Sequence, residues 1–445
     1  MAKIVVITTG LTGILNASFE LVNRLQQAGH ECVCASTMPV EDKIEAQGFS
    51  CLPLDLVNFD PAPDVPNYKG PLRKVQRLLH KIIYVRERRK QAVKALGMDA
   101  FMKKIKGVNP DLVIIDIELH EHIMTLVTSP FKVLLLSQWF STWNRKGLPP
   151  IVSDIIPGEG KKGIEQGIQN AWDEIIQQRK RTFLKKKLTS VFTDRRSILQ
   201  LYAQQIGFSK KYIPENYWPG PFSYDQLPVI SITDKSLEFP HDFRPDLTYV
   251  GSMVYVNRKE EANQEINEKL TAVFKQQNEK NKKLIYCSVS TFKEGDKHFL
   301  KNVIKACKGQ HNWLLIISLG GLMDANEFHN LPENVYAFLR VPQLEVLKRA
   351  DLSINHGGIH TINECLHFRV PMLVYSGKRS DQSGCAARVH YHGVGIMGDK
   401  DIDESEEIRK KIEVVLNDRK IQESIDQLGK TENVKLEKFV ASYII

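Results

Sequence analysis

The segment 350–375 limits the fold of this chain more narrowly than any other feature. An apolar run at 350–355 is followed by two glycines, a helix-like stretch that begins near Ile359, and a second apolar run at 368–375. A short apolar run bounded by a charged segment and by glycines is typical of a buried parallel strand. The segment therefore predicts a parallel α/β sheet, with ligands at the carboxyl ends of its strands.

The same segment carries polar groups that suit a nucleotide sugar. Glycines let the backbone approach a ligand closely, and the free N–H groups of a first helical turn, with the Thr361 hydroxyl beside them, suit a phosphate. Glu364, one turn later, can accept both hydroxyls of a ribose. Asp381 and Gln382 together accept and donate, as a sugar ring requires. Each group alone also fits a tight turn, a solvated helix or a polar loop; their order and spacing favour a binding site.

Residues 356–389 resemble the signature of the UDP-dependent glycosyltransferases, the inverting enzymes of the GT-B architecture, and especially its bacterial, macrolide-type members. That signature runs HxGxxSxxExxxxxxPxxxxxxxxDQxxNAxxV. The matching positions are His356, Gly358, Thr361, Glu364, Pro371, Asp381, Gln382, Ala386 and Val389. Two positions depart from it, since His360 stands where the family has Asn or Gly and Cys385 replaces an Asn. Neither departure removes the phosphate or sugar contacts.

Three further stretches carry the resemblance. Residues 341–347 are similar to the segment WxPQxxVL that holds the uracil, with Arg340 at the position of the aromatic residue, where a guanidinium can stack on the base. Residues 284–291 resemble the first strand and loop of the donor domain, whose hydroxyls reach the diphosphate. Residues 240–251 match the stretch before the linker. The implied donor site consists of Ser288, Thr291, Arg340, Val341, Gln343, His356, Gly358, His360, Thr361, Glu364, Asp381 and Gln382.

The resemblance implies the GT-B fold, an α/β architecture of two doubly wound Rossmann-like domains that face each other across a cleft. The N-terminal half agrees with it, because strands are predicted at 2–10, 32–35, 111–115 and 133–136 and a helix at 16–28. The expected organisation is an acceptor-binding domain at 1–251, a linker at 252–270, a donor-binding domain at 271–430, and a segment at 431–445 that packs back on the first domain.

Length and cysteine content indicate the class of protein and its compartment. A chain of 445 residues can form two or more domains with large cores. The first strand begins at once, and no apolar stretch reaches the ~18 residues of a membrane span. Seven cysteines without a CxxC pair suggest free thiols in a reducing compartment. We therefore expect a cytoplasmic protein, with peripheral contact at the inner membrane face left open.

Positive charge is concentrated in one region. The chain carries 61 Lys and Arg against 52 Asp and Glu, a net +9, whereas 67–106 alone contains 13 basic and 2 acidic residues, a net +11. This region predicts an amphipathic helix with a stripe formed by Leu72, Val75, Leu78, Leu79, Ile82, Ile83 and Val85. A second basic run lies at 179–187. Contact with an anionic membrane is one interpretation, and a solvated face that covers the acceptor pocket is the other. Nucleic acid is not expected as a partner, because no recognised binding motif accompanies the helix.

The sequence departs from the family pattern at the position of the catalytic base. An inverting transfer needs a group that takes the proton of the acceptor hydroxyl. The family uses a histidine after the first strand, and Ile14 stands there; Asp116 occupies the position of the aspartate that holds this histidine. Three answers are open: Asp116 is itself the base, His120 or His122 takes the vacant place, or the acceptor is a carboxylate or phenol that needs no base. We favour Asp116 assisted by His120.

Aromatic residues after the predicted strand 133–136 suggest an acceptor pocket. Trp139 and Trp143, with Ile14 and His122, can line an apolar pocket, although core packing or a lid contact explains the two tryptophans equally well. No metal is expected, because His120 and His122 have no identifiable third ligand and the acidic loop 399–401 is interpreted as solvated. The only cofactor-like molecule is the UDP-sugar, as co-substrate.

These observations predict metal-independent, inverting transfer of a hexose from UDP to a hydroxyl, carboxyl or phenol of a small lipophilic acceptor. Glu364 favours UDP over thymidine diphosphate, and Asp381 with Gln382 favours glucose, with galactose and N-acetylglucosamine as alternatives. Because of Ile14, a catalytically impaired member that serves as a nucleotide-sugar sensor or partner subunit is a second hypothesis. A nucleotide-sugar epimerase shares the architecture but lacks the Asp-Gln signature.

Overall fold

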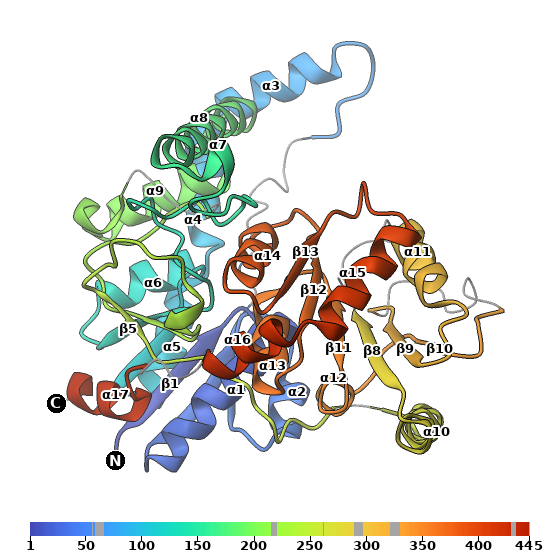
Figure 1. Ribbon diagram of the computed structural model, residues 1–445. Helices are drawn as coiled ribbons and strands as arrows, with labels where there is room; N and C mark the ends of the chain where they lie inside the picture. Colours follow the sequence, from blue (N-terminus) through green and yellow to red (C-terminus); the bar gives the residue numbers. More distant parts are fainter. Residues whose placement is uncertain are drawn as a thin grey trace.

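Two parallel β-sheets flanked by helices form the molecule (Figure 1). The computed structural model describes residues 1–55, 57, 66–214, 220–260, 262–288, 297–320, 330–428 and 433–444. The first sheet has the strand order β3-β2-β1-β4-β5-β6-β7 and the second the order β10-β9-β8-β11-β12-β13. In both, the order reverses beside the first strand, which is the doubly wound pattern that the sequence predicts.

The first sheet is built by residues before 250. Its elements are β1 (Lys3–Thr8), α1 (Thr12–Gln27), β2 (Glu31–Ser36), α2 (Glu41–Ala46), β3 (Cys51–Pro53), α3 (Arg73–Ile83), α4 (Val85–Lys94), α5 (Met98–Val108), β4 (Leu112–Asp116), α6 (His120–Val127), β5 (Val133–Ser137), α7 (Gly160–Gly163), α8 (Glu165–Thr189), α9 (Arg195–Gln205), β6 (Val229–Ser231) and β7 (Leu247–Tyr249). All residues of β4 and β5 are buried, as central strands of a parallel sheet require.

The second half of the chain follows a connecting segment and contains the second sheet. Its elements are α10 (Gln264–Lys280), β8 (Lys283–Ser288), α11 (Lys297–Cys307), β9 (Trp313–Ser318), β10 (Val335–Phe338), α12 (Gln343–Leu347), β11 (Leu352–Asn355), α13 (Ile359–His367), β12 (Met372–Tyr375), α14 (Gln382–Tyr391), β13 (Gly395–Gly398), α15 (Ser405–Asn417), α16 (Arg419–Gln427) and α17 (Leu436–Ile444). Strand β11 pairs in parallel with both β8 and β12, which confirms the unit predicted from 350–375.

Two predicted helices differ in extent from the structure. Helix α1 begins at Thr12 rather than at residue 16, because the chain turns at Gly10, whose φ of +78° favours glycine, and the helix starts directly afterwards. The amphipathic stretch is two helices, since α3 ends at Ile83 and α4 begins at Val85. Tyr84, with φ of −97° and ψ of 15°, breaks the helix between them.

Helix α17 lies against the first sheet. Its Leu436 and Val440 are buried in the same core cluster as Ile4 of β1, and the Tyr443 hydroxyl donates to the Val133 carbonyl oxygen at 2.9 Å. The last helix therefore completes the core that the first strand begins. The exact domain boundaries at 251, 270 and 430 stay predictions.

A buried ion pair joins the two halves of the molecule. Arg388 of α14 donates through Nη2 to Oε2 of Glu238 at 2.8 Å, and the two side chains are 1% and 0% exposed. The guanidinium also lies over the rings of Phe140 and Phe239. Oε1 of Glu238 accepts from the backbone N–H of Ser141. Because every oxygen of this carboxylate has a donor, the buried charges are compensated.

A close backbone contact lies beside this pair. The N–H of Gly384 donates to the carbonyl oxygen of Ile151 at 2.9 Å, and a Cβ at residue 384 would approach that oxygen to 2.3 Å. Only glycine allows α14 to pack this closely on the residues that follow β5. Among the described residues, no helix has the length and apolar character needed to cross a membrane. None of the seven cysteines, all of which lie in the described part of the chain, forms a disulfide bond.

Candidate functional site

The start of α13 provides backbone N–H groups for an anion. Gly358 caps this helix without a side-chain hydrogen bond, so the N–H groups of the first turn remain available. Gly357 has φ of +81°, and a Cβ there would lie 2.8 Å from the carbonyl oxygen of Gln382, so no larger residue fits. Ser288, at the end of neighbouring β8, has a buried hydroxyl without a partner among the described residues. Thr291, the other predicted phosphate contact, lies outside the described residues.

Glu364 is held by two side chains from different parts of the chain. Its Oε1 accepts from Nη1 of Arg258 at 2.8 Å, and its Oε2 accepts from Nε2 of Gln343 at 2.5 Å. Burial alone would lower the pKa of Arg258, but Glu364 and Glu260 outweigh it and the pKa is raised. The carboxyl group predicted to bind ribose is thus oriented by two hydrogen-bond donors. Arg258 was not predicted, because it lies in a segment interpreted as linker; the paired charges of Arg258 and Glu260 were the available signal.

The predicted base-binding segment lies between β10 and α12. Arg340 is exposed, and Val341 is partly buried against the hydrophobic core of the second sheet. The Tyr286 hydroxyl donates to Oε1 of Gln343 at 3.1 Å, which fixes the orientation of that amide toward Glu364. His356 and Thr361 are half-buried at the start of α13. The structure thus brings the ribose and phosphate candidates together around α13.

Asp381 and Gln382 stand where α14 begins. Burial raises the pKa of Asp381 to about 7, and the Glu118 carboxylate raises it further while the Cys385 thiol opposes this. Cys385, which replaces the family's Asn, donates through Sγ to Oδ2 of Asp381 at 3.4 Å. Gln382 accepts through Oε1 from the N–H of Gly377 at 2.9 Å. The predicted sugar-binding pair is therefore pre-oriented by its own loop and helix.

Asp116 lies at the carboxyl end of β4 and is fully buried. Its Oδ1 accepts from the N–H of Glu118 at 3.0 Å, and its Oδ2 accepts from Nε2 of Gln138 at 3.2 Å. Burial raises its pKa to about 7, with a further contribution from Glu118. A carboxyl group with this pKa can hold or release a proton at neutral pH, as a general base must. Glu118, whose N–H holds Asp116, also raises the pKa of Asp381, and sequence analysis missed it.

His120 and His122 lie in the first turn of α6. Nδ1 of His120 is 3.0 Å from the Tyr224 hydroxyl, and burial lowers its pKa to about 3, so its imidazole is neutral. His122 is 1% exposed and packs edge-on against Phe101 of α5, with ring centroids 4.6 Å apart. His120 therefore belongs to a buried group with Tyr224, whereas His122 faces the core of the first half.

The tryptophans after β5 are in different environments. Trp143 is 6% exposed and donates through Nε1 to the carbonyl oxygen of Tyr224 at 3.3 Å, with the Arg244 guanidinium 4.1 Å above its ring. Trp139 is partly buried and packs against the core of the second sheet. Trp143 is thus part of a packed layer around Tyr224, and Trp139 contacts the opposite half.

Helix α13 also reaches across to α1. A Cβ built on Gly13 would lie 3.1 Å from Cδ2 of His360, so this imidazole packs on the backbone directly before Ile14. Nδ1 of His360 is buried and has no partner among the described residues. Burial lowers the pKa of His360 to about 4, and Arg258 contributes, so the ring is neutral. A histidine of the second half thus stands beside the position where the family carries its own.

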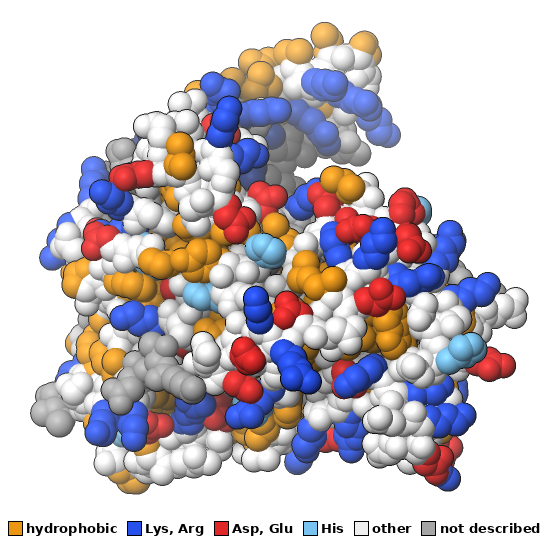
Figure 2. All heavy atoms as spheres, viewed as in Figure 1, with side chains coloured by type: hydrophobic (Ala, Val, Ile, Leu, Met, Phe, Trp, Pro, Cys, Tyr) orange, Lys and Arg blue, Asp and Glu red, His pale blue; other side chains and the backbone are white. Residues whose placement is uncertain are grey.

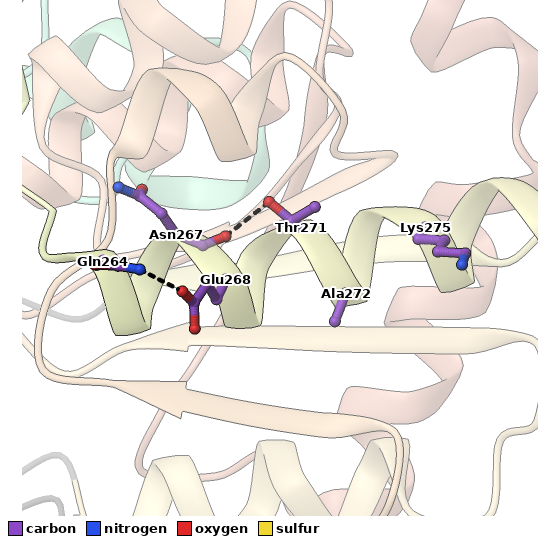
Figure 3. Close-up of a pocket in the computed structure, with 6 residues that line it drawn as sticks. All are labelled: Gln264, Asn267, Glu268, Thr271, Ala272 and Lys275. Atoms are coloured by element: carbon purple, nitrogen blue, oxygen red, sulfur yellow. Dashed lines mark hydrogen bonds between the residues drawn. The ribbon is translucent and has the colours of Figure 1, made fainter.

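The described residues contain no cluster of three or more potential metal ligands. Asp401 of the acidic loop binds Nζ of Lys378 at 2.6 Å, and Asp399 lies 3.6 Å from the same nitrogen. This loop is a surface ion-pair group. A hollow elsewhere runs along a single face of α10, as Figure 3 shows. Among the described residues it is lined by Gln264, Asn267, Glu268, Thr271, Ala272 and Lys275. Because this described lining comes from one helix, the hollow does not bring side chains of different elements together and is not the candidate site.

Comparison with known sequences agrees with the geometry. Residues 315–435 match the family model of the erythromycin biosynthesis protein CIII-like C-terminal domain. The uncharacterized UDP-glucosyltransferase YojK of Bacillus subtilis is 29% identical over 34% of this chain and 37% of its own length. The NDP-glycosyltransferase YjiC of the same organism is 27% identical over 50% and 54%, respectively. The chain thus spans about a third to a half of the length of these relatives.

Solved structures match the whole chain. The glycotransferase of kitacinnamycin has a TM-score of 0.66 at 16% identity and covers 100% of this chain and 99% of its own. CalG4, the calicheamicin glycosyltransferase, has a TM-score of 0.64 at 16% identity over 100% and 98%. The two facing parallel sheets therefore define a protein of the GT-B class. Residues 315–435, which contain α13 and α14, are thus similar to a glycosyltransferase family model, and part of the chain is similar to bacterial UDP-glycosyltransferases.

Proposed function

We propose that this protein transfers a hexose from a UDP-sugar to a hydroxyl group of a small acceptor, with inversion at the anomeric carbon. The observation that carries this proposal is that helix α13 of the second half meets the edge of the first sheet where Asp116 lies. His360 of α13 packs on Gly13, which follows β1, and Asp116 ends the neighbouring parallel strand β4. A candidate base of the first half and the candidate donor-binding helix of the second half therefore face the same edge of the first sheet. Such an arrangement suits transfer of a sugar from one half of the molecule to an acceptor held by the other.

The donor in this proposal is UDP-glucose. Glu364, held by Arg258 and Gln343, accepts the two ribose hydroxyls, and the first turn of α13 binds the diphosphate. The diphosphate leaves with its negative charge stabilised by backbone N–H groups, so the chemistry needs no metal. Asp381 and Gln382 bind the hexose hydroxyls. Relatives described as UDP-glucosyltransferases support glucose as the sugar.

Asp116 acts as the base in this proposal. Its carboxylate takes the proton of the acceptor hydroxyl while that oxygen attacks the anomeric carbon and the bond to the diphosphate oxygen breaks. We assign His120 an assisting role, because it follows Asp116 closely in the chain and its neutral imidazole is held by the Tyr224 hydroxyl. The acceptor is a lipophilic alcohol or phenol; one relative is the zeaxanthin glucosyltransferase of Pantoea ananas, 30% identical over 25% of this chain.

A second candidate function is nucleotide-sugar binding without turnover. Ile14 is 6% exposed and cannot take a proton, which is the observation that favours this alternative. In that case the protein would serve as a sensor or partner subunit. The two functions share the donor site and differ only in whether an acceptor is glycosylated.

UDP release from UDP-glucose, measured with EDTA and a panel of phenolic, terpenoid, carotenoid and lipid alcohols, separates the two. Acceptor-dependent release supports the transferase, and donor binding without release on any acceptor supports the sensor. Asp116→Asn should reduce kcat by roughly 10²- to 10⁴-fold while leaving donor affinity nearly unchanged. Asp399→Asn, in the surface loop, is the matched control. Full activity of the Asp116 variant would remove this residue as the base.

A further inference from the structure

Helix α3 leaves a continuous apolar stripe uncovered. None of its 11 residues is buried. The large apolar side chains along it are exposed to 46–69% of their area: Leu72, Val75, Leu78, Leu79, Ile82 and Ile83. Their spacing of three and four residues places them on one side of the helix. A contiguous patch of exposed apolar side chains marks an interaction site, whereas single exposed apolar residues are common on protein surfaces.

The opposite side of α3 is purely basic. Arg73, Lys74, Arg77 and Lys81 share that side, and the helix contains no Asp or Glu. Figure 1 shows α3 projecting from the first half, away from both sheets, and Figure 2 shows hydrophobic and basic side chains together at this end of the molecule. The surface therefore combines an apolar stripe with flanking positive charge over three turns of helix.

A second basic and apolar segment emerges from the same part of the fold. Residues 179–187 in α8 contain six basic and no acidic residues. Leu184 within this run and Leu188 directly after it are 57% and 58% exposed. The end of α8 is fixed beside α4, because Nη2 of Arg88 donates to the Thr193 hydroxyl at 3.3 Å. Since α4 continues α3 after one residue, both segments belong to one end of the first half.

We propose that α3, supported by the last turns of α8, docks on an anionic lipid bilayer. The apolar stripe would lie at the boundary of the acyl chains and the basic side chains at the level of the lipid phosphates. A second copy of the chain is a poorer occupant, because it would oppose two regions that each carry a net +11. A soluble acidic protein would pair with the charges but needs its own matching apolar face. This docking surface is independent of the transferase activity proposed above.

The test is vesicle flotation with the full chain. Phosphatidylcholine vesicles that contain phosphatidylglycerol should bind the protein, whereas pure phosphatidylcholine vesicles should bind it weakly, and added salt should release it. Each basic residue near an anionic surface strengthens binding by roughly fivefold, so Arg77→Glu with Lys81→Glu should weaken binding by more than tenfold. Leu79→Ser with Ile83→Ser should also abolish stable flotation.

Matched controls keep the result specific. Lys275→Glu reverses a charge on α10, where its side chain is 72% exposed, and Val414→Ser removes an apolar residue that is 49% exposed on α15. Both should float like the unaltered protein, and circular dichroism checks that all variants fold. Absence of flotation on anionic vesicles, or flotation unaffected by the α3 variants, overturns the proposal. Concentration-dependent dimerisation that the Leu79 and Ile83 changes abolish would instead assign this surface to a second copy.

Discussion

Two buried carboxyl groups in the candidate site have raised pKa values. Asp116 and Asp381 belong to different sheets, yet burial raises the pKa of each to about 7 and Glu118 adds to both shifts. Burial disfavours the ionised form of a carboxyl group, and a neighbouring negative charge does the same. Both pKa values therefore lie near neutral pH, well above the ordinary range of carboxyl groups.

The pH profile tests this residue-scale argument. A base must be ionised, so kcat/KM should rise with pH through about 7 if Asp116 has the pKa that its burial gives it. Glu118→Gln removes a negative charge, which favours ionisation of Asp116 and should move this limb to lower pH. Glu423→Gln, on the exposed side of α16, should leave it in place. A limb near the ordinary carboxyl pKa in the unaltered protein would contradict the argument.

Ile14 and His360 offer a second test at the same scale. His360 packs on Gly13, so a histidine placed at residue 14 needs the smaller Asn of the family pattern at residue 360. Ile14→His combined with His360→Asn should raise kcat by about tenfold or more, because a positioned base of this type contributes strongly to proton transfer. Steady-state kinetics with UDP-glucose measure this, with His360→Asn alone as control. An unchanged kcat in the combined variant would show that Asp116 already suffices.

At the scale of elements, the segment before α10 contributes to the donor site. Arg258 comes from outside the second sheet and reaches Glu364 of α13, so the candidate donor site includes a residue of the connecting segment as well as residues of the second half. Its side chain is 6% exposed and compensates two carboxylates. Ion pairs therefore hold the segment between the sheets at the candidate nucleotide site.

Arg258→Ala should weaken UDP binding by roughly tenfold or more, because hydrogen bonds to charged groups contribute about 1.5–3 kcal/mol and Glu364 would lose its orientation. Isothermal titration calorimetry with UDP measures the change. Arg349→Ala removes a guanidinium that pairs with Glu345 on the exposed surface and should have little effect. Equal or tighter UDP binding in the Arg258 variant would exclude an orienting role.

The Glu238–Arg388 pair connects α14 with the first half. Arg388→Ala leaves Glu238 as an uncompensated buried charge, which should lower the free energy of unfolding by about 3–5 kcal/mol. Arg388→Met with Glu238→Gln should recover part of this loss. Urea denaturation followed by circular dichroism measures the shift, and Lys269→Ala, which breaks an exposed pair, should change stability very little. Equal shifts in both single variants would contradict a special role of the buried pair.

At the scale of the whole molecule, local patterns predict the sheets but not the contacts between them. The β11–α13–β12 unit can be predicted from the sequence, because buried parallel strands are continuous apolar runs and the glycines lie between them. The pairs Arg258–Glu364 and Glu238–Arg388 join residues 106 and 150 positions apart, and no periodicity encodes them. The break at Tyr84 was missed because the apolar spacing continues across it. Glu118 was missed because its effect exists only once both halves are folded.

The return of α17 to the first sheet has a consequence for biosynthesis. Leu436 and Val440 share a core with Ile4, so the half that a ribosome makes first lacks part of its interior until these residues emerge. Chains that end before residue 433 should therefore be cleaved faster by protease within their first 250 residues than the full chain. Pulse proteolysis of ribosome-bound chains measures this, and equal cleavage would show that the first half matures alone. Faster cleavage of the shorter chains would show that the two halves become stable together, late in synthesis.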